Sequence, residues 1–273
     1  MAISPATRKR FGASVALALG LYAVISLGAH LVAPSMLFRP ELASRQEATG
    51  AVTIPLADGT RVQAVYLPNP QAAFTLWYFH GNAESLGSIA ARLQRLHDIG
   101  FAVFASEYPG YGQSTGGPSE DSFYAAARAA REYLRGQLGV PAARTIAYGG
   151  SVGGGPAVQM ATEERLGGLV LQSAFMSAYR VMTRWPLVPG DGFQNLGKMG
   201  RVACPVLVIH GRQDSLVPFY HGEALYAAAR EPKRHLWVDA AGHNDLLSLA
   251  WEPFQEAMRQ FSELCANTGG AKP

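Results

Sequence analysis

Cysteine and charge are both scarce in this chain of 273 residues. The two cysteines, Cys204 and Cys265, lack the spacing of metal ligands, and a single pair implies no disulfide framework. We therefore expect buried or free thiols, no metal site and no cofactor. Charged residues make up 16% of the chain and the net charge is +3, which is too small to indicate nucleic-acid binding. The sequence also contains no internal repeat and no low-complexity tract.

Charge is absent altogether from residues 11–29, which also contain no histidine. As a helix this stretch would be about 28 Å long, close to the thickness of the hydrocarbon core of a bilayer. Arg8, Lys9 and Arg10 come directly before it, and basic residues favour the cytoplasmic side of a membrane. We predict a signal anchor within residues 1–34, with a cytoplasmic N-terminus. The rest of the chain would be extracytoplasmic, which means periplasmic if the cell is a Gram-negative bacterium.

Other roles for this apolar segment stay open. A cleaved signal peptide would show small residues at a cleavage site, and no convincing site lies near residues 26–29. A core helix would also be apolar, and such a helix could lie over a binding pocket in a wholly cytoplasmic protein. Lipoprotein processing is excluded because no cysteine lies near the segment.

The rest of the chain alternates strand-like and helix-like stretches. An apolar content of 48% is enough for a sizeable core, and residues 35–265 fit one domain. Residues 52–56 and 62–66 flank an Asp-Gly turn and predict a hairpin. The alternation after it predicts an α/β fold with a mostly parallel, doubly wound sheet, and we expect a flexible tail at 266–273. The predicted strands are 74–79, 101–104, 144–148, 168–171, 204–210 and 234–239, and the predicted helices are 84–97, 120–135 and 151–164.

Residues 174–203 interrupt the alternation and are rich in apolar and aromatic side chains. They lie between two predicted strands, at the end of the sheet where ligands bind in such folds. We predict a short cap whose apolar side chains line a pocket for an acyl chain or another hydrophobic group. The alternative is that this stretch only covers the core, and the two roles are compatible.

Residues 149–153 read Gly-Gly-Ser-Val-Gly, a G-x-S-x-G pattern between the predicted strand 144–148 and a helix of small residues. This context is typical of a nucleophile elbow, a tight turn that lifts a serine hydroxyl above the sheet edge. The flanking glycines are needed because strand and helix almost touch there. We predict Ser151 as the nucleophile, and a simple turn or a phosphate-binding helix start is the alternative.

An acid and a base follow the serine in the order that such a site requires. Asp214 lies in the loop after the predicted strand 204–210, and His243 lies in the loop after the last predicted strand. We predict that His243 takes the serine proton and that Asp214 holds the other ring nitrogen. Asp245 and Glu107 are the rival acids, since each also lies just after a predicted strand.

A fourth part of the site is expected after the predicted strand 74–79, which runs into the loop 80–83, His-Gly-Asn-Ala. One backbone N–H from this loop and the N–H of Val152 would form an oxyanion hole. Such donors stabilise the negative charge of a tetrahedral intermediate. We favour the Asn82 N–H, and Ala83 is the next choice because spacing alone does not separate them.

The other histidines receive structural interpretations. His80 is expected to pack beneath its loop, and His210, at the end of a buried strand, is expected to be a satisfied core histidine. His97, His221 and His235 lie on predicted polar faces and are expected to be solvated.

Taken together, these motifs resemble the α/β-hydrolase superfamily, and more narrowly its BEM46-like and serine aminopeptidase-like group. The resemblance covers about residues 36–262. The matching motifs are residues 80–83, 108–112 (Tyr-Pro-Gly-Tyr-Gly), 149–153, 205–211 with Asp214, and 241–245 (Ala-Gly-His-Asn-Asp).

The resemblance implies a catalytic triad of Ser151, Asp214 and His243 that needs no cofactor. It also fits an N-terminal membrane segment, which members of this group often carry. We expect a serine hydrolase that cleaves carboxylic esters or thioesters of small-molecule or lipid acyl groups. An aminopeptidase-like amide hydrolase and a membrane-tethered, non-catalytic binding protein are the alternatives. The chain departs from the pattern at Gly155, which extends the glycine run, and at Glu107, where similar sequences often have Asp.

Overall fold

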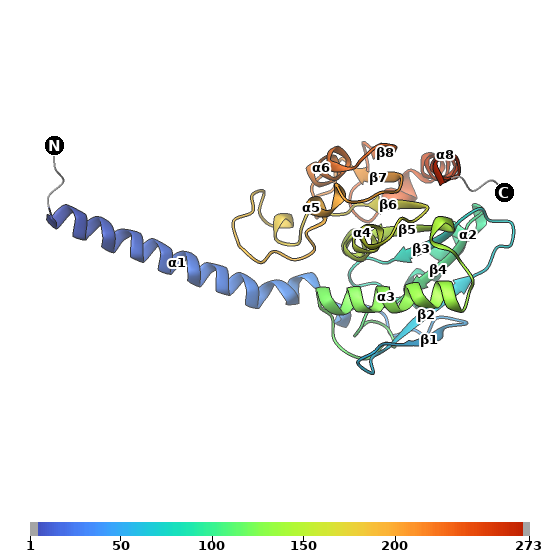
Figure 1. Ribbon diagram of the computed structural model, residues 1–273, viewed down its shortest axis with the longest axis horizontal. Coiled ribbons are helices and arrows are strands. Elements are labelled where there is room, and N and C mark those ends of the chain that lie inside the picture. The colour runs from blue at the N-terminus through green and yellow to red at the C-terminus, as the bar shows by residue number, and fades with distance from the viewer. Residues whose placement is uncertain (1–4, 270–273) are drawn as a thin grey trace.

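The computed structural model describes residues 5–269, and side chains are described for residues 11–268. Figure 1 shows a long helix, α1 (Pro5–Leu37), that projects away from an α/β body holding the rest of the chain. A linker with one 3₁₀ turn (Pro40–Leu42) joins the two parts.

The body is built on one sheet, whose strands in the described part of the chain are β1 (Val52–Pro55), β2 (Arg61–Leu67), β3 (Thr75–Phe79), β4 (Ala102–Ser106), β5 (Thr145–Gly150), β6 (Gly168–Gln172), β7 (Val206–Gly211) and β8 (Lys233–Val238). Their order is β1-β2-β4-β3-β5-β6-β7-β8. The pairs β1–β2 and β2–β4 are antiparallel, and all other neighbouring pairs are parallel. The predicted hairpin and the predicted mostly parallel, doubly wound sheet are therefore confirmed.

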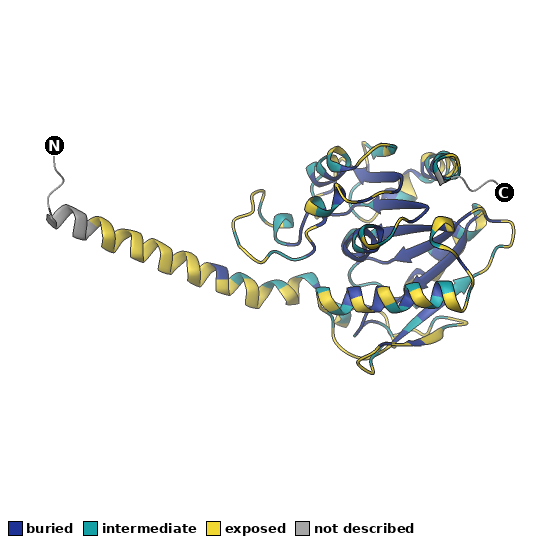
Figure 2. Cartoon of the chain, viewed as in Figure 1, coloured by how far each residue is buried: buried dark blue, intermediate teal, exposed yellow. Residues whose placement is uncertain are grey.

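Helices cover both faces of this sheet, and they are α2 (Leu86–Asp98), α3 (Glu120–Gly136), α4 (Gly154–Glu163), α5 (Asn195–Met199), α6 (Tyr220–Ala228), α7 (Leu246–Leu249) and α8 (Trp251–Gly269). Apolar side chains of α2 and α8 pack on one face, and those of α3, α4 and α6 pack on the other. The central strands are consequently buried on both sides, which is why they read as continuous apolar runs (Figure 2). Ser85 and Ser119 begin α2 and α3 with reciprocal capping boxes.

Helix α1 is exposed along most of its length (Figure 2). By length and composition alone it could cross a membrane, and only 6% of its most apolar stretch is buried in the protein. It extends past the predicted span 11–29 and past the predicted boundary at residue 34, because Leu37 and the adjacent Phe38 pack against the core of the body. The side chains of the basic cluster at residues 8–10 lie outside the described part of the chain.

The predicted cap, residues 174–203, is mostly irregular, with one 3₁₀ turn (Tyr179–Val181) before the short helix α5. Phe193 in this segment is fully buried. It packs against Gly155 in α4, where any side chain would collide with the phenyl ring. The extra glycine after the G-x-S-x-G motif therefore makes room for the cap.

The C-terminal helix ends later than the sequence analysis predicts. The expectation of a flexible tail is wrong for residues 266–269, which continue α8. Phe261 and Cys265 are buried and hold the last turns of this helix against the sheet. Residues 270–273 lie outside the described residues.

The turn between β5 and α4 is unusually tight. Ser151 has a φ of +52°, a left-handed conformation that is rare for a residue with a side chain. A Cβ on Gly149 would lie only 2.5 Å from the carbonyl oxygen of Gly153. A Cβ on Gly153 would collide with the carbonyl oxygen of Phe79 in β3. The two glycines thus let the start of α4 rest directly on the two neighbouring strands.

We expect Gly153→Ala to lower the free energy of unfolding by about 3 kcal/mol, because the new methyl group would displace backbone atoms held by the sheet. In a domain of this size, this change corresponds to a Tm that is roughly 6–12 °C lower. The control is Gly136→Ala in α3, where an added Cβ meets open space and helix propensity improves. Thermal unfolding followed by circular dichroism compares the variants, and equal Tm values would contradict the tight packing of this turn.

Candidate active site

Ser151, His243 and Asp214 are joined by hydrogen bonds although they are far apart in the sequence. His243 Nε2 lies 3.1 Å from Ser151 Oγ, and His243 Nδ1 lies 2.7 Å from Asp214 Oδ2. The three residues follow β5, β8 and β7, so they meet at the carboxyl ends of parallel strands. The structure therefore brings together the three residues that the sequence analysis selects.

Asp214 is held firmly by its own loop. Its Oδ1 accepts hydrogen bonds from the backbone N–H groups of Leu216 and Val217, at 3.0 and 2.7 Å. Burial by itself would raise the pKa of this carboxyl, but hydrogen bonds from His210 and His243 hold the pKa well below its usual value. Asp214 is consequently ionised at neutral pH and can stabilise a positive charge on His243.

His210 contributes more than the sequence analysis expects of a core histidine. It is fully buried at the end of β7. Its Nε2 donates to the Val217 carbonyl oxygen at 2.8 Å and lies 3.4 Å from Asp214 Oδ2. A second imidazole thus supports the same carboxylate. The sequence signal that could have revealed this contact is that Asp214 comes four residues after His210, across the end of β7.

The two rival acids have other partners. Asp245 Oδ1 accepts the backbone N–H of Gly242 at 2.7 Å. Glu107 is buried, and its two oxygens bind the first backbone N–H of α2 at 2.6 Å and His80 Nε2 at 3.0 Å. Within the described residues, neither carboxylate bonds to His243. The pair of Glu107 and His80 instead ties the loop after β4 to the loop after β3, which is the structural role expected of His80.

The loop after β3 presents one unused backbone N–H beside Ser151. The Asn82 N–H has no acceptor among the residues that the structure describes, and Asn82 and Val152 both line the cavity next to Ser151. The neighbouring N–H groups both have acceptors. The Gly81 N–H donates to the Glu84 side chain at 2.8 Å, and the Ala83 N–H donates to the Asn82 side chain at 3.0 Å. Of the two candidates from the sequence, the geometry favours Asn82 as the oxyanion donor.

The side chain of Asn82 connects this loop to the end of α1. Asn82 Oδ1 accepts the Tyr111 hydroxyl at 2.7 Å and the Arg39 backbone N–H at 2.9 Å. Tyr111 is buried in the loop after β4, and Arg39 begins the linker after α1. Sequence reasoning assigned no role to either residue. Tyr111 lay within a family motif, whereas a bond through the Arg39 backbone leaves no sequence signal.

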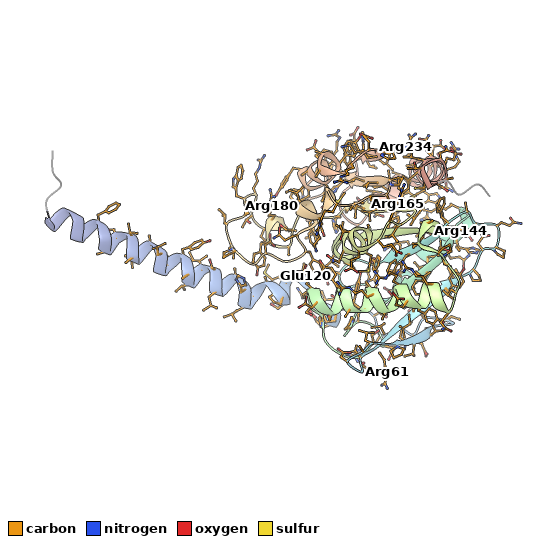
Figure 3. The ribbon with its side chains drawn as sticks, in the orientation of Figure 1. Arg61, Glu120, Arg144, Arg165, Arg180 and Arg234 are labelled. Carbon is orange, nitrogen blue, oxygen red and sulfur yellow. The ribbon has the colours of Figure 1, made fainter. Side chains whose placement is uncertain are left out.

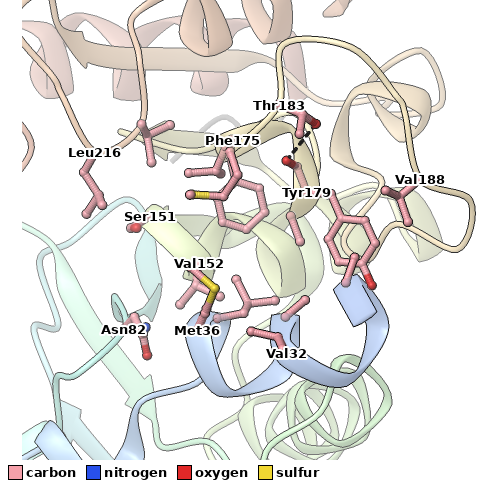
Figure 4. Close-up of a pocket in the computed structure, with 17 residues that line it drawn as sticks. Val32, Met36, Asn82, Ser151, Val152, Phe175, Tyr179, Thr183, Val188 and Leu216 are labelled. Atoms are coloured by element: carbon pink, nitrogen blue, oxygen red, sulfur yellow. Dashed lines mark hydrogen bonds between the residues drawn. The ribbon is translucent and has the colours of Figure 1, made fainter. Parts of the chain in front are cut away.

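An apolar cavity of about 330 Å³ opens beside Ser151, within the range of roughly 300–1,000 Å³ typical of ligand pockets. Figure 4 shows Ser151 and Asn82 at one end and Tyr179 and Val188 of the cap at the other. The cap thus lines an apolar pocket, as predicted. Helix α1 forms one wall of this cavity. The sequence analysis named an apolar helix over a pocket only as an alternative to a membrane anchor. The lining residues from α1 are Ala29, Val32, Ala33, Met36 and Leu37.

A second and more polar cavity, of about 500 Å³, meets the apolar one at Ser151. Arg92 lies in its wall, where it pairs with Glu84 at 2.8 Å and donates to the Tyr78 hydroxyl at 3.1 Å. A bound carbonyl group at Ser151 would therefore have apolar surroundings on one side and polar surroundings on the other. Other polar lining residues are Arg39, Gln172, Ser173 and Asn244.

One of the remaining histidines differs from expectation. His97 and His235 are at least partly exposed, as expected. His221, which the sequence analysis assigns to a solvated face, is fully buried at the start of α6 and accepts the Met176 N–H at 3.1 Å. Burial, assisted by nearby His210, lowers the pKa of His221 to about 4. This neutral imidazole joins α6 to the base of the cap, a contact that helical periodicity alone could not reveal.

This arrangement is suited to acyl transfer, because a serine, a base and an acid are hydrogen-bonded in series, and the serine lines an apolar cavity together with two residues whose N–H groups are candidate donors. The thiols lie apart from it. Cys204 and Cys265 are buried and free, and burial raises the pKa of Cys204 to about 12, which makes it a poor nucleophile. No group of three or more His, Cys, Asp or Glu side chains within the described residues is placed to hold a metal ion.

Comparison with known proteins identifies sequence relatives. A profile of the alpha/beta hydrolase fold matches residues 75–189. The chain is 41% identical over 206 residues to alpha/beta hydrolase domain-containing protein aho-3 of Caenorhabditis elegans, a match that covers 73% of this chain but only 60% of that protein. It is also 34% identical over 209 residues to alpha/beta hydrolase domain-containing protein 17B of Homo sapiens. This match covers 74% of this chain and 71% of the human protein.

Solved structures share the architecture at lower identity. An esterase of Pyrococcus furiosus, Pf2001, superposes with a TM-score of 0.67 at 19% identity over 78% of this chain and 89% of its own. An esterase of Exiguobacterium antarcticum superposes with a TM-score of 0.60 at 16% identity, over 78% of this chain and 99% of its own. These likenesses show the fold, and the sequence relatives show the ancestry. The chain therefore belongs to the α/β-hydrolase superfamily, among the alpha/beta hydrolase domain-containing proteins.

Proposed function

We propose that this protein is a membrane-anchored serine hydrolase that cleaves carboxylic ester or thioester bonds through an acyl-enzyme on Ser151. The observation that carries the proposal is the hydrogen-bonded series from Asp214 through His243 to Ser151, which ends at the mouth of an apolar cavity. A binding protein would not need all three residues in this geometry.

In the first half of the reaction, Ser151 Oγ attacks the substrate carbonyl carbon while its proton moves to His243 Nε2. The carbonyl oxygen becomes an oxyanion that accepts hydrogen bonds from the N–H groups of Asn82 and Val152. The C–O or C–S bond then breaks, and His243 gives its proton to the leaving alcohol or thiol. Asp214 stabilises the imidazolium throughout.

In the second half, water attacks the acyl-enzyme and His243 takes one of its protons. The Ser151–acyl bond breaks, the proton returns to Ser151, and the carboxylic acid leaves. No other reactant is required.

The two cavities support an acyl substrate. The apolar cavity between α1 and the cap suits a hydrocarbon chain, because burying each methylene contributes about 0.8 kcal/mol. The polar cavity on the other side of Ser151 suits the leaving group. The apolar side is short, so we expect medium-length acyl groups to be favoured over peptides.

The first test is of the nucleophile. A fluorophosphonate probe should label the wild-type protein and not Ser151→Ala, and turnover of a reactive ester should fall by at least about 10³-fold in the variant. The control is Ser44→Ala, which removes an exposed hydroxyl in the linker and should keep full labelling. Labelling that persists in Ser151→Ala would contradict this nucleophile. A wild-type protein that resists the probe and hydrolyses no ester would favour the non-catalytic binding protein.

The second test is of the acyl pocket. Ala33→Phe should fill the apolar cavity and reduce kcat/KM for p-nitrophenyl octanoate about tenfold, with p-nitrophenyl acetate changed by less than about twofold. The control is Ala23→Phe, at an exposed position on the same helix that does not line the cavity. An equal loss for both esters would contradict the placement of the chain. If aminoacyl anilides react faster than esters, relative to the uncatalysed rates, the result would favour the aminopeptidase-like alternative.

We also propose that α1 spans the membrane between residues 11 and 29, with a cytoplasmic N-terminus and an extracytoplasmic body. The support is the length and apolar surface of α1, together with the basic cluster at residues 8–10. A bare apolar helix of this length would be insoluble in water unless it were covered.

A fusion of residues 1–50 to a phosphatase that is active only after export tests this topology. We expect an active reporter, and we expect replacement of Arg8, Lys9 and Arg10 by Glu to lower its activity, because basic flanks set the orientation. A silent reporter, or full-length uncleaved protein in the soluble fraction, would show that α1 is not an anchor. A smaller, soluble periplasmic product would instead indicate a cleaved signal peptide.

A further inference from the structure

Ser173 lies beside the proposed nucleophile, at the end of the next strand of the sheet. Strands β5 and β6 pair in parallel, and the last pair in their register is Gly150 with Gln172. Ser151 and Ser173 are the residues that follow this pair. Because neighbouring strands lie about 4.8 Å apart, the two serines leave the sheet side by side, and both line the polar cavity.

The backbone of Ser173 is held in an unusual conformation. Its φ is +50°, close to the +52° of Ser151, and both values lie in the left-handed region that residues with a side chain rarely adopt. The Ser173 N–H donates to the Ile209 carbonyl oxygen of β7 at 2.9 Å, which ties the residue to the sheet. Strain of this kind persists only where the surrounding structure imposes it, and it is concentrated at functional sites.

The hydroxyl of Ser173 is buried without a partner. The residue is 2% exposed, and its Oγ makes no hydrogen bond to any residue that the structure describes. A buried hydroxyl that lacks a partner costs free energy, so a bound group that pairs with it gains affinity. Because Ser173 lines the polar cavity and not the apolar one, this bound group belongs to the leaving-group side of Ser151.

Two neutral amide side chains share this cavity with Ser173. Gln172 and Asn244 both line it. Gln172 Oε1 accepts a hydrogen bond from the buried Tyr148 hydroxyl, which leaves the two amide N–H donors of Gln172. Asn244 comes directly after His243, the proposed base. The polar cavity thus offers uncharged donors and acceptors close to the reacting groups.

The charged groups of the polar cavity are already paired. Arg92 lies 2.8 Å from Glu84, and Arg39 pairs with Glu41. These two arginines are the cations that line the cavity within the described residues. An anionic leaving group, such as a phosphate ester, would have to compete with these carboxylates for the guanidinium groups, whereas a neutral leaving group would not.

Other basic side chains of the body lie away from this cavity. Arg144 directly precedes β5, and Arg165 comes shortly before β6, so both lie at the opposite end of the parallel strands from Ser151 (Figure 3). The charge distribution therefore favours a neutral, hydrogen-bonding leaving group over a phosphate or a carboxylate.

We infer that Ser173 determines leaving-group specificity, and that its hydroxyl binds a second hydroxyl on the leaving alcohol, at the carbon adjacent to the one that carries the scissile oxygen. The substrates are then esters of small polyhydric alcohols. The inference rests on the proposed hydrolase. The scissile oxygen must lie at His243 beside Ser151, and Ser173 begins one strand spacing away, a gap that a vicinal hydroxyl bridges. When the C–O bond breaks, the leaving oxygen takes the proton from His243, and the second hydroxyl stays bonded to Ser173.

The test compares 2-hydroxyethyl butyrate with n-propyl butyrate, which share the acyl group and differ only in a terminal hydroxyl against a methyl group. After correction for the uncatalysed rates, the wild-type protein should have a kcat/KM about tenfold higher for the hydroxyethyl ester, and Ser173→Ala should bring this ratio to about one. Ser173→Gly should do the same. It removes the hydroxyl and suits the left-handed backbone, so the comparison stands even if Ser173→Ala fails to fold.

Ser177→Ala is the matched control. Ser177 is also 2% exposed and its Oγ also has no partner among the described residues, but it lines neither cavity. This variant should keep the wild-type ratio of the two esters.

Three results would overturn the inference. A wild-type protein that hydrolyses both esters with equal kcat/KM would do so and leave the proposed function intact, and so would an unchanged ratio in Ser173→Gly. An equal loss on both esters, with the acyl-enzyme accumulating, would show that Ser173 serves the attacking water instead of the leaving group. A wild-type protein that hydrolyses neither ester and resists the fluorophosphonate probe would refute the proposed function, and this inference with it.

Discussion

The candidate site depends on the close approach of Gly153, just before α4, to the carbonyl oxygens of Phe79 and His80 at the end of β3. No side chain fits there, so the elbow and the end of β3 are held in one fixed relation. That relation fixes the left-handed backbone of Ser151 and brings the N–H of Val152 and the loop carrying Asn82 to the same cavity. Preorganised donors of this kind need no rearrangement when charge develops. This tight turn, which Gly149 and Gly153 permit, thus places Ser151 next to the two proposed oxyanion donors.

Helix α1, the proposed anchor, also contributes to the candidate site. Its last turns form a wall of the apolar cavity, and the linker that follows it bonds through the Arg39 N–H to Asn82, the proposed oxyanion donor. In the proposed function, substrate binding and membrane attachment therefore share one element. Because the helix is packed against the cap through His30 and Tyr179, the position of the body relative to the proposed span is constrained, and the cavity points along the helix.

Buried imidazoles hold the site from behind. His80 with Glu107 joins the loops after β3 and β4, His210 supports Asp214, and His221 joins α6 to the base of the cap. None of these groups lines either of the two cavities beside Ser151. Their hydrogen bonds are made inside the protein, although His210 Nδ1 and His221 Nε2 have no partner among the described residues, and these bonds connect the loops that carry the candidate site residues.

The sequence by itself determined the succession of strands, three helices of the body, the elbow at Ser151, and the selection of Asp214 and His243, because periodicity, glycine spacing and chain order are local signals. It did not indicate the helices after residue 194. The uncharged run at 11–29 is also the sequence signal for the proposed anchor. Only the tertiary structure decided that Asp214 and not Glu107 meets His243, that Asn82 and not Ala83 has an unused N–H, and that α1 closes the pocket. These outcomes depend on contacts between residues far apart in the chain, often through backbone atoms, which have no side-chain signature.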